Sequence, residues 1–294
     1  MKRRRRIRKK HRMDFRLTWQ RHTLNLHRKT CVMGVLNVTP DSFSDGGRFL
    51  EPKKAVAHGL QMASDGAHII DIGGESTKPY SKKISSAEEI DRVVPVIHTL
   101  SKELSIPLSI DTTKSNVAME ALDAGASMIN DISALNLDPE MGVLAAKAEV
   151  PVILMHIRGK PENMQDNPEY DDVVEDILDF LQSAIDRCVD LGIRKDLIIV
   201  DPGIGFGKTF THNLQILRSL DRFKALERPI LVGSSNKAFI GHITGRKPNE
   251  RDTGSMAAAA ASVMNGAHMV RVHNVKKAVE TVKIIDAIKY GIPG

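Results

Sequence analysis

Polar side chains stand at the ends of apolar runs throughout this sequence, and they are of types that bind substrates or metals. The run that begins at Val32 ends in the amide of Asn37, and a polar loop reaching Gly47 follows at once. Burying an amide or a carboxylate is costly unless it makes hydrogen bonds or binds a metal. The other run-ending residues are Asp71, Asp111, Asn130 with Asp131, His156, Asp201, Ser235, and Arg271 with His273. Since nearly every run ends in this way, the pattern predicts a functional cleft rather than isolated helix caps.

A glycine-rich segment extends from Asp201 to Thr209. It is similar to a phosphate-binding P-loop, but Pro202 stands where that motif requires its first glycine. We therefore interpret it as a loop in which glycine lets the backbone approach a ligand and leaves Phe206 free to stack. A flexible turn without a ligand is the alternative.

Two kinds of segment alternate along the chain and would position these residues. Short apolar runs begin near Val32, His68, Pro107, Ser127, Pro151, Leu197, Pro229 and His268. Between them, apolar residues recur every three or four positions, which predicts helices. The expected helices are Ala55–Ser64, Ala87–Leu104, Val117–Ala124, Met141–Ala148, Val173–Leu191, Leu214–Leu220, Ser255–Asn265 and Ala278–Lys289.

Eight strand–helix units in strict alternation predict a parallel sheet closed as a (β/α)8 TIM barrel, in one domain over residues 14–294. A doubly wound open sheet is the alternative, although it more often has fewer strands and a glycine-rich first turn. Before the first unit, Phe15–Trp19 and Leu24–His27 predict a β-hairpin. The C-terminal strand ends of a barrel meet on one face, so this fold would bring the polar residues together.

The positive net charge is concentrated at the start of the chain. The 294 residues carry a formal charge of +6, but residues 1–12 hold nine Lys or Arg and no acid. The remainder holds 33 basic against 36 acidic residues. We expect residues 1–13 to be a disordered basic arm; a tail for nucleic acid or an anionic surface, and a true start at Met13, are the alternatives. Nothing else resembles a nucleic-acid module, so nucleic acid is not an expected partner.

Cysteine usage and hydropathy favour a cytoplasmic enzyme. Cys31 and Cys188 lack metal-type spacing and do not form a disulfide framework. No apolar run approaches the ~18 residues of a membrane span. The basic start is not followed by the apolar segment of a secretion signal.

Seven segments in order resemble the dihydropteroate synthase family. They are Val32–Gly47, Asp71–Pro79, Ile110–Thr112 with Asn130–Ser133, Met155–Gly159, Asp201–Lys208, Gly233–Gly241 and Arg271–Asn274. The likeness runs from about Phe15 to the C-terminus. It implies a TIM barrel that joins 6-hydroxymethyl-dihydropterin diphosphate to p-aminobenzoate, releases pyrophosphate and serves folate biosynthesis. It also implies a target of sulfonamides.

The resemblance implies roles for individual residues. The residues expected to bind the pterin diphosphate are Thr77, Asp111, Asn130, Asp201, Lys237, Arg271, Val272 and His273. Those expected on the p-aminobenzoate side are Phe43, Thr77, Pro79, Phe206 and Ser235. Asp41, Lys237 and Asp201 are the expected catalytic residues, Asp41 beside a pterin cation. Asn37 matches the metal position, and the expected cofactor is Mg²⁺, which suits a diphosphate leaving group. The family also suggests a homodimer through the last helices, where Ala257–Ala261 offers small residues.

Four positions depart from the family's usual pattern. Lys78 and Asn236 stand where arginine is common, Asn274 where aspartate is common, and Tyr80 where glycine is common. Replacing arginine by lysine keeps the charge but loses the planar fork. We therefore expect unchanged pterin recognition with altered affinity for p-aminobenzoate and its sulfonamide analogues.

Two other functions compete with this interpretation. A corrinoid-dependent methyltransferase barrel shares the polar strand ends but should lack the Thr39–Phe43 and Ser235–Lys237 segments, both of which are present. A non-catalytic pterin-binding protein is the other alternative, since the departures could have removed turnover. Pyrophosphate release with and without p-aminobenzoate distinguishes these possibilities.

Overall fold

The computed structural model describes residues 15–39 and 51–292 of the chain. Eight strands form one sheet in the order β8-β7-β6-β5-β4-β3-β10-β9, and every pairing in it is parallel. The strands are β3 Cys31–Asn37, β4 Ile69–Gly73, β5 Leu108–Asp111, β6 Met128–Asp131, β7 Val152–Met155, β8 Ile198–Asp201, β9 Leu231–Val232 and β10 Met269–Val272. A parallel bridge between Val200 and Ile230 joins the two edges. The predicted barrel is therefore confirmed, and the open sheet is wrong.

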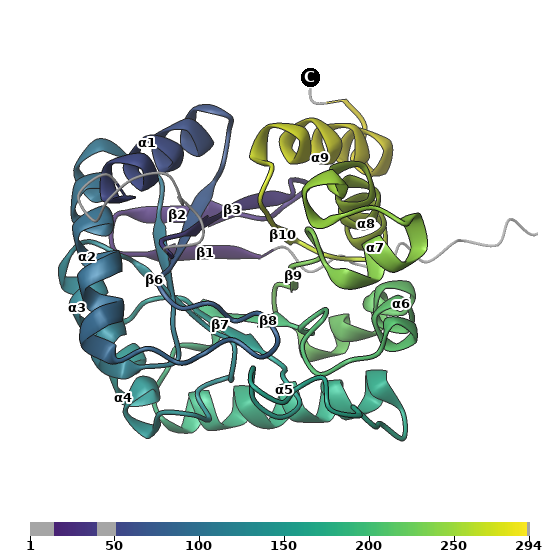
Figure 1. Cartoon of the computed structure of the whole chain (residues 1–294), viewed down its shortest axis with the longest axis horizontal. Helices are drawn as coiled ribbons and strands as arrows, with labels where there is room; N and C mark the ends of the chain where they lie inside the picture. Colours follow the sequence, from purple (N-terminus) through teal and green to yellow (C-terminus); the bar gives the residue numbers. More distant parts are fainter. Residues whose placement is uncertain (1–14, 40–50, 293–294) are drawn as a thin grey trace, which may run out of the picture.

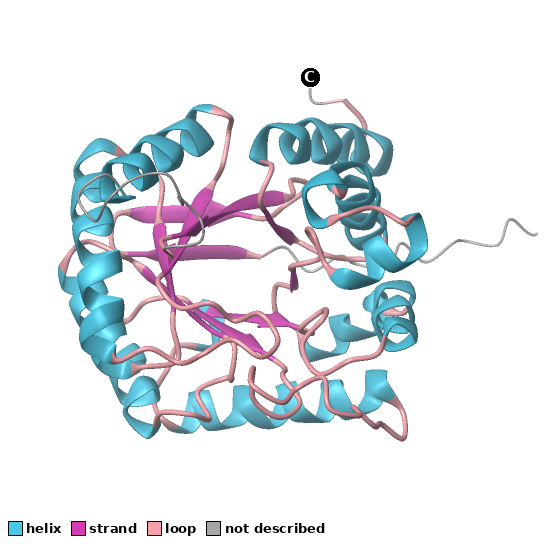
Figure 2. Ribbon diagram, in the orientation of Figure 1, coloured by secondary structure: helices cyan, strands magenta, loops and turns pink. Residues whose placement is uncertain are grey.

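Helices surround the strands on the outside of the barrel (Figures 1 and 2). They are α1 Glu51–Ser64, α2 Ser86–Glu103, α3 Ser115–Asp123, α4 Pro139–Ala148, α5 Val173–Asp190, α6 Phe210–Arg218, α7 Ala238–Thr244, α8 Asp252–Met264 and α9 Val275–Tyr290. Short 3₁₀ helices cover Lys195–Leu197, Leu220–Leu226 and Pro248–Glu250. The first of these, η2, leads into β8.

Side-chain caps determine where several helices begin. The Asp172 carboxylate accepts hydrogen bonds from the backbone N–H groups of Val174 and Glu175 at the start of α5. Ser85 caps α2 in the same way through the Glu88 N–H. Such caps satisfy N–H groups that have no partner within the helix. Asp138, Thr209 and Asn274 cap α4, α6 and α9 in this way, and the polar first turns of these helices lie inside them. These three helices, and also α1, α3 and α8, begin earlier than their apolar periodicity predicts.

A hairpin of β1 Arg16–Trp19 and β2 His22–Asn25 packs at the N-terminal end of the barrel. Its buried side chains are Leu17, Trp19 and Leu24. β1 contacts η2 just before β8 begins, and the Phe15 ring meets the His268 ring just before β10 begins. The hairpin therefore closes the end of the barrel away from the polar strand ends. Its second strand starts two residues earlier than predicted, because Gln20, at φ 43°, permits a two-residue turn.

Both cysteines are buried, and burial makes their thiols unreactive. Cys31 and Cys188 are buried free thiols, and loss of hydration raises the pKa of each to about 12. A thiol with so high a pKa does not serve as a nucleophile at neutral pH.

In the ranges described above, no helix is long and apolar enough to span a bilayer. The expected basic arm, together with Asp41 and Phe43, lies outside the described residues.

Candidate functional site

Arg271 brings together carboxylates from two other strands at the C-terminal face of the barrel. Its Nε donates to Asp71 Oδ2 and its terminal NH2 nitrogen to Asp111 Oδ2, both at 2.6 Å. β10 supplies the arginine, β4 Asp71 and β5 Asp111. Burial opposes the charge of Arg271, but the two carboxylates outweigh this effect and raise its pKa. The strand ends therefore converge as the sequence predicts, with Arg271 spanning two of them.

Asn130 joins this group from β6. Its Nδ2 donates to Asp71 Oδ2 at 2.9 Å, so one oxygen of Asp71 accepts from both Asn130 and Arg271. The other oxygen of Asp71 is buried and has no hydrogen-bond partner among the described residues. Burial raises the pKa of Asp111 to about 7, although Arg271 opposes this rise. The sequence pattern places Asp71 at a strand end but does not reveal that it fixes both Arg271 and Asn130.

Asp201 ends β8 inside the glycine-rich loop. Its Oδ1 accepts the Gly203 N–H at 2.7 Å, and burial raises its pKa to about 6 against the opposing charge of Lys237. Gly203 has a φ of 72°, and a Cβ there would collide with the carbonyl oxygen of His156. Only glycine lets the loop fold this closely over β7.

Lys237 and Phe206 stack against each other beside Asp201. The Lys237 ammonium lies 3.9 Å from the centre of the Phe206 ring, a cation–π contact. Burial, followed by the charge of Arg271, lowers the pKa of Lys237 to about 8. Phe206 packs in a small apolar cluster with Ile132, Met155 and Met164. Apolar atoms therefore lie beside hydrogen-bonding groups, which is the composition of a pocket for a flat heterocycle.

His273 and Ser235 form a polar group at the mouth of the barrel. His273 Nδ1 lies 3.0 Å from Ser235 Oγ, and its backbone N–H donates to the same oxygen at 3.3 Å. His273 is exposed to solvent, yet partial loss of hydration and then the charges of Arg271, Lys237 and Lys78 lower its pKa to about 4. Such a concentration of positive charge next to a neutral imidazole suits an anion. Val272, the residue between Arg271 and His273, is buried in β10.

Lys208 is fully buried behind the glycine-rich loop, in a role that no sequence motif revealed. Its Nζ lies 2.9 Å from His156 Nδ1, and it donates to the backbone oxygens of Phe206 at 2.9 Å and His156 at 3.3 Å. Burial lowers the pKa of Lys208, and it lowers that of His156 to about 2. The Lys208–His156 pair therefore fixes the loop that carries Phe206. In the sequence, only the position of Lys208 near the end of the glycine-rich segment pointed to this role.

The β4–α2 loop provides the outer wall of the site. Thr77 and Asp111 line one cavity of about 340 Å³, so this loop and the Asp111 carboxylate share the same space. Pro79 is exposed near the tip of the loop. Tyr80 has a φ of 62°, a left-handed conformation that costs a tyrosine on the order of 1 kcal/mol. Its hydroxyl donates to Asp166 at 3.0 Å, which ties the loop to the β7–α5 loop and offsets that strain.

Two other departures from the family pattern have local physical reasons. Asn236 has a φ of 59°, which asparagine tolerates better than most residues. Asn274 caps α9 by accepting the Lys277 N–H, and its Nδ2 donates to Asp252 Oδ2 at 2.8 Å. An aspartate at this position could cap the helix but could not donate to Asp252. Nothing in the structure explains why Lys78 replaces arginine.

Asn37 ends β3 and is partly exposed at the same face as the carboxylates. Within the ranges that the structure describes, no group of three or more His, Cys, Asp or Glu side chains could hold a metal. A single amide oxygen fits Mg²⁺ only where substrate phosphates and water supply the other ligands, as this ion prefers. The donor set therefore fits a metal shared with a diphosphate, not one caged by protein.

Comparisons with known proteins agree with this geometry. The model of the pterin binding enzyme family matches residues 33–273. Dihydropteroate synthase of Bacillus subtilis (strain 168) is 46% identical over 265 residues, which are 90% of this chain and 90% of that protein. The structure of Xanthomonas albilineans dihydropteroate synthase with 4-aminobenzoic acid has a TM-score of 0.86 at 43% identity, covering 92% of this chain and 96% of that chain. The same enzyme in complex with 7,8-dihydropteroate gives a TM-score of 0.84 at 42% identity, covering 92% and 97%. With its closed barrel and convergent strand ends, this chain therefore belongs to the dihydropteroate synthase family of pterin-binding enzymes.

Proposed function

We propose that this protein condenses 6-hydroxymethyl-7,8-dihydropterin diphosphate with p-aminobenzoate to give 7,8-dihydropteroate and pyrophosphate. One observation supports this most directly. Asp111 and Asn130 contact the same Arg271–Asp71 pair, and Asp201 interacts electrostatically with Arg271 and with Lys237 of the Lys237–Phe206 stack. Few ligands other than a flat heterocycle with alternating donors and acceptors would use such a set.

The pterin end of the substrate would occupy this group. Asp111 and Asp201 accept from the pterin N–H groups, and Asn130 and Lys237 donate to its carbonyl and ring nitrogens. Asp111 already accepts from the Arg271 guanidinium at 2.6 Å. The pterin ring carries a similar N–C(NH2)–N edge, so it presents Asp111 with the geometry that the carboxylate meets in Arg271.

The diphosphate end would lie toward Arg271, Val272 and His273, with Thr77 on the loop side. The charge of Lys78 reaches His273, which places further positive charge at this end. Asn37 would hold Mg²⁺ together with diphosphate oxygens, and the bound ion supplies positive charge to the leaving group. The protein groups keep the anion in place while its bond to the pterin weakens.

Charge separation is the step that these residues assist. The bond between the pterin methylene carbon and the diphosphate oxygen breaks, and its electron pair leaves with pyrophosphate. The p-aminobenzoate nitrogen then forms a bond to that carbon and loses one proton. Asp201 and Lys237 orient the pterin while it carries the developing cation.

Asp41 is proposed to stabilise this cation. An Asp41→Asn enzyme should therefore turn over more slowly in a steady-state assay, and unaltered turnover would overturn that role.

The second substrate would enter from the loops. Phe206 and Ser235 lie at the mouth of the barrel, and Thr77 and Pro79 are on the β4–α2 loop. Phe43 is proposed to complete this side. Water that reaches a carbocation destroys it, so these loops would shield the reaction as well as bind the amine.

The assay that tests this function measures pyrophosphate release from the pterin diphosphate, with and without p-aminobenzoate. We expect release that depends on the amine, with dihydropteroate as the second product. A Lys237→Met variant should lose most of the rate, because removing an oriented charged donor from a closed site typically costs about a hundredfold. Binding of the pterin without amine-dependent release would instead indicate a non-catalytic binding protein.

We further propose that the enzyme is a homodimer through α6, α7 and α8, which lie side by side (Figure 1). An apolar groove between them is lined by Leu214, Phe239, Ile243 and the small residues Ala257 and Ala261. Ile243 is 59% exposed and Leu214 45% exposed. A second copy of this chain would cover them, since small residues permit close helix approach and the groove carries almost no polar surface.

A further inference from the structure

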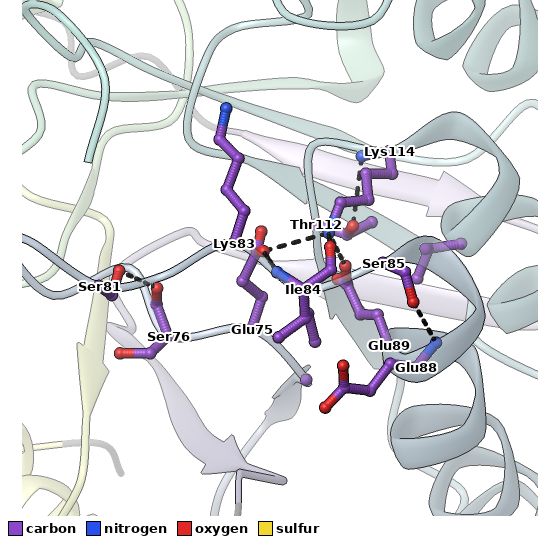
Figure 3. Close-up of polar contacts among 12 residues, drawn as sticks. Glu75, Ser76, Ser81, Lys83, Ile84, Ser85, Glu88, Glu89, Thr112 and Lys114 are labelled. Carbon is purple, nitrogen blue, oxygen red and sulfur yellow. Dashed lines mark hydrogen bonds and ion pairs between the residues drawn. The ribbon is translucent and has the colours of Figure 1, made fainter. Parts of the chain in front are cut away.

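Lys114 stands at the start of α3, three residues after Asp111, and its ammonium group contacts three residues in two segments (Figure 3). It donates to Glu89 Oε2 at 2.6 Å and to the Ile84 backbone oxygen at 3.1 Å. It also forms an ion pair with Glu75 Oε1 at 3.2 Å. One side chain from the β5–α3 loop therefore holds two positions of the β4–α2 loop and one position of α2.

The two loop contacts lie at opposite ends of the same segment. Glu75 begins it, immediately after Gly74, and Ile84 ends it just before the Ser85 cap of α2. Glu75 Oε1 also accepts the Ile84 N–H at 2.8 Å, so the two ends contact each other as well as Lys114. Residues 75–84 therefore form a loop whose two ends, here called its neck, are held together by their own hydrogen bond and by the Lys114 ammonium. Thr77 and Pro79 lie within this loop.

Glu89 anchors this arrangement to the barrel. Its side chain is fully buried, and its second oxygen, Oε1, has no hydrogen-bond partner in the part of the chain that the structure describes. A Cβ at Gly74 would press on Glu89 and Val93, so the loop leaves β4 directly against this part of α2. Because a buried carboxylate needs a countercharge, Glu89 fixes the position of Lys114.

The outer part of the loop has weaker attachments. Lys83 forms an ion pair with Glu162 at 3.1 Å between two exposed side chains, and such pairs contribute little. The Tyr80 N–H donates to the Pro161 oxygen at 3.2 Å near the exposed tip. The contacts at the neck are less exposed than these and therefore dominate the placement of the loop.

We propose that Lys114, Glu89 and Glu75 form a clamp that positions residues 75–84 for the second substrate; this role rests on the proposed function of the site. Lys114 is a positioning residue, since it acts through Thr77 and Pro79. Its neighbour Asp111 lies on the pterin side, so the clamp holds the amine-side wall at a fixed place relative to the pterin. Loss of the clamp should impair capture of p-aminobenzoate much more than binding of the pterin diphosphate, because most of the proposed pterin diphosphate contacts come from strand ends and only Thr77 comes from this loop.

Two variants test the clamp without leaving a bare buried charge. Glu75→Ala removes the loop end and keeps the Lys114–Glu89 pair. The double variant Lys114→Met with Glu89→Gln replaces the pair by neutral groups of similar size. In each, KM for p-aminobenzoate should rise on the order of tenfold, with kcat changed less than about twofold. The KM for the pterin diphosphate should rise by a clearly smaller factor, because Thr77 is its only proposed contact from the loop. Glu75→Gln, which keeps an acceptor for the Ile84 N–H, should recover part of the loss.

Glu162→Gln is the matched control, because it breaks an ion pair to the same loop outside the clamp. Its kinetic constants should equal those of the unmodified enzyme. Equal losses in kcat and in both KM values for the clamp variants would overturn the proposal, because they indicate general damage. Unchanged KM values would overturn it too.

A second readout does not depend on the reaction. Trypsin can cut after Lys82 and Lys83, both exposed in the loop. Cleavage there should be faster in the clamp variants than in the control, as followed by mass spectrometry. Cleavage at the unmodified rate would mean that no clamp exists. If loop cleavage accelerates but the unmodified protein shows no amine-dependent pyrophosphate release, the proposed function fails while the clamp stands.

Discussion

Several side chains of the site have pKa values closer to neutrality than they would have in water. Asp111 and Asp201 have pKa values raised to about 7 and 6, and that of Lys237 is lowered to about 8. Desolvation is the largest cause in each case. Arg271 favours the charged form of Asp111, the Gly203 N–H and Lys237 favour that of Asp201, and Asp201 favours that of Lys237. A ligand that supplies further hydrogen bonds would therefore change their protonation as well as occupy the site.

The cost of burying Asp201 should appear as a pH-dependent stability difference. Its folded-state pKa of about 6 lies above the ordinary value of 3.8, so the folded protein holds more protons than the unfolded chain between these values. Stability from this group therefore falls as pH rises from 4 to 6. Asp201→Asn keeps an acceptor for the Gly203 N–H and should stabilise the ligand-free protein by on the order of 3 kcal/mol above pH 6.

Urea unfolding at pH 4 and pH 7 measures this difference. At pH 4 the difference should be below about 1 kcal/mol, because Asp201 is then protonated in the folded protein and nearly half protonated in the unfolded chain. A variant that is less stable at pH 7 would contradict the assigned pKa direction.

At the level of elements, loops and helix caps account for most of what the sequence did not reveal. Apolar periodicity located eight of the helices but missed their polar first turns. It also missed α7, a seven-residue helix in which Phe239 and Ile240 are the buried residues and Gly241 interrupts the pattern. Contacts such as Lys114 with Glu89, 25 positions apart, leave no periodic trace because they depend on how two βα units pack. The strand ends were predictable since topology alone brings them together.

The cap of α9 predicts that the effect of Asn274→Asp on the free energy of unfolding depends on the residue at position 252. Asn274→Asp retains the acceptor for the Lys277 N–H but places a carboxylate against Asp252, and should destabilise the protein by about 1 kcal/mol. In an Asp252→Asn background the same change should be neutral or stabilising, because the new amide donates to the introduced carboxylate and a negative charge suits a helix N-terminus. Equal effects in both backgrounds, measured by urea unfolding, would exclude the Asn274–Asp252 hydrogen bond as the cause.

The loop departures predict a change in amine affinity. The double variant Lys78→Arg with Asn236→Arg adds a guanidinium fork and one positive charge beside His273. It should alter KM for p-aminobenzoate, and the inhibition constant of a sulfonamide analogue, by roughly three- to tenfold without changing pterin affinity. Asn236→Ala is the control for loss of the left-handed asparagine. Equal constants for all three proteins would show that these departures do not influence the second substrate.

For the whole molecule, the closed barrel places the apolar core and the polar site at different ends. The hairpin and apolar strands fill the N-terminal end, and the polar residues occupy the C-terminal end. Eight alternating units were enough to predict closure. The proposed dimer surface was not predictable from periodicity, because exposed apolar residues such as Ile243 look like ordinary members of a helical face in sequence.

The dimer proposal is tested by placing a charge in the groove. Ile243→Glu should shift the protein from dimer to monomer in sedimentation velocity, since a second copy would have to bury the new carboxylate. Val143→Glu, at a 51% exposed site on α4 away from the groove, should leave the dimer intact. A monomeric unmodified protein, or an Ile243→Glu dimer of equal strength, would rule out this interface.

The pairing of β3 with β10 has a consequence for how the protein is made. Met33 on the first strand of the sheet pairs with Arg271 on the last, so the arginine is synthesised 238 positions after its partner. At about 5–20 residues per second, the ribosome needs roughly 10 to 50 seconds for this interval. During that time Asp71 and Asp111 have left the ribosome without the guanidinium that balances them. The nascent chain therefore completes its active centre and closes its barrel in the same late event, and a truncated chain achieves neither.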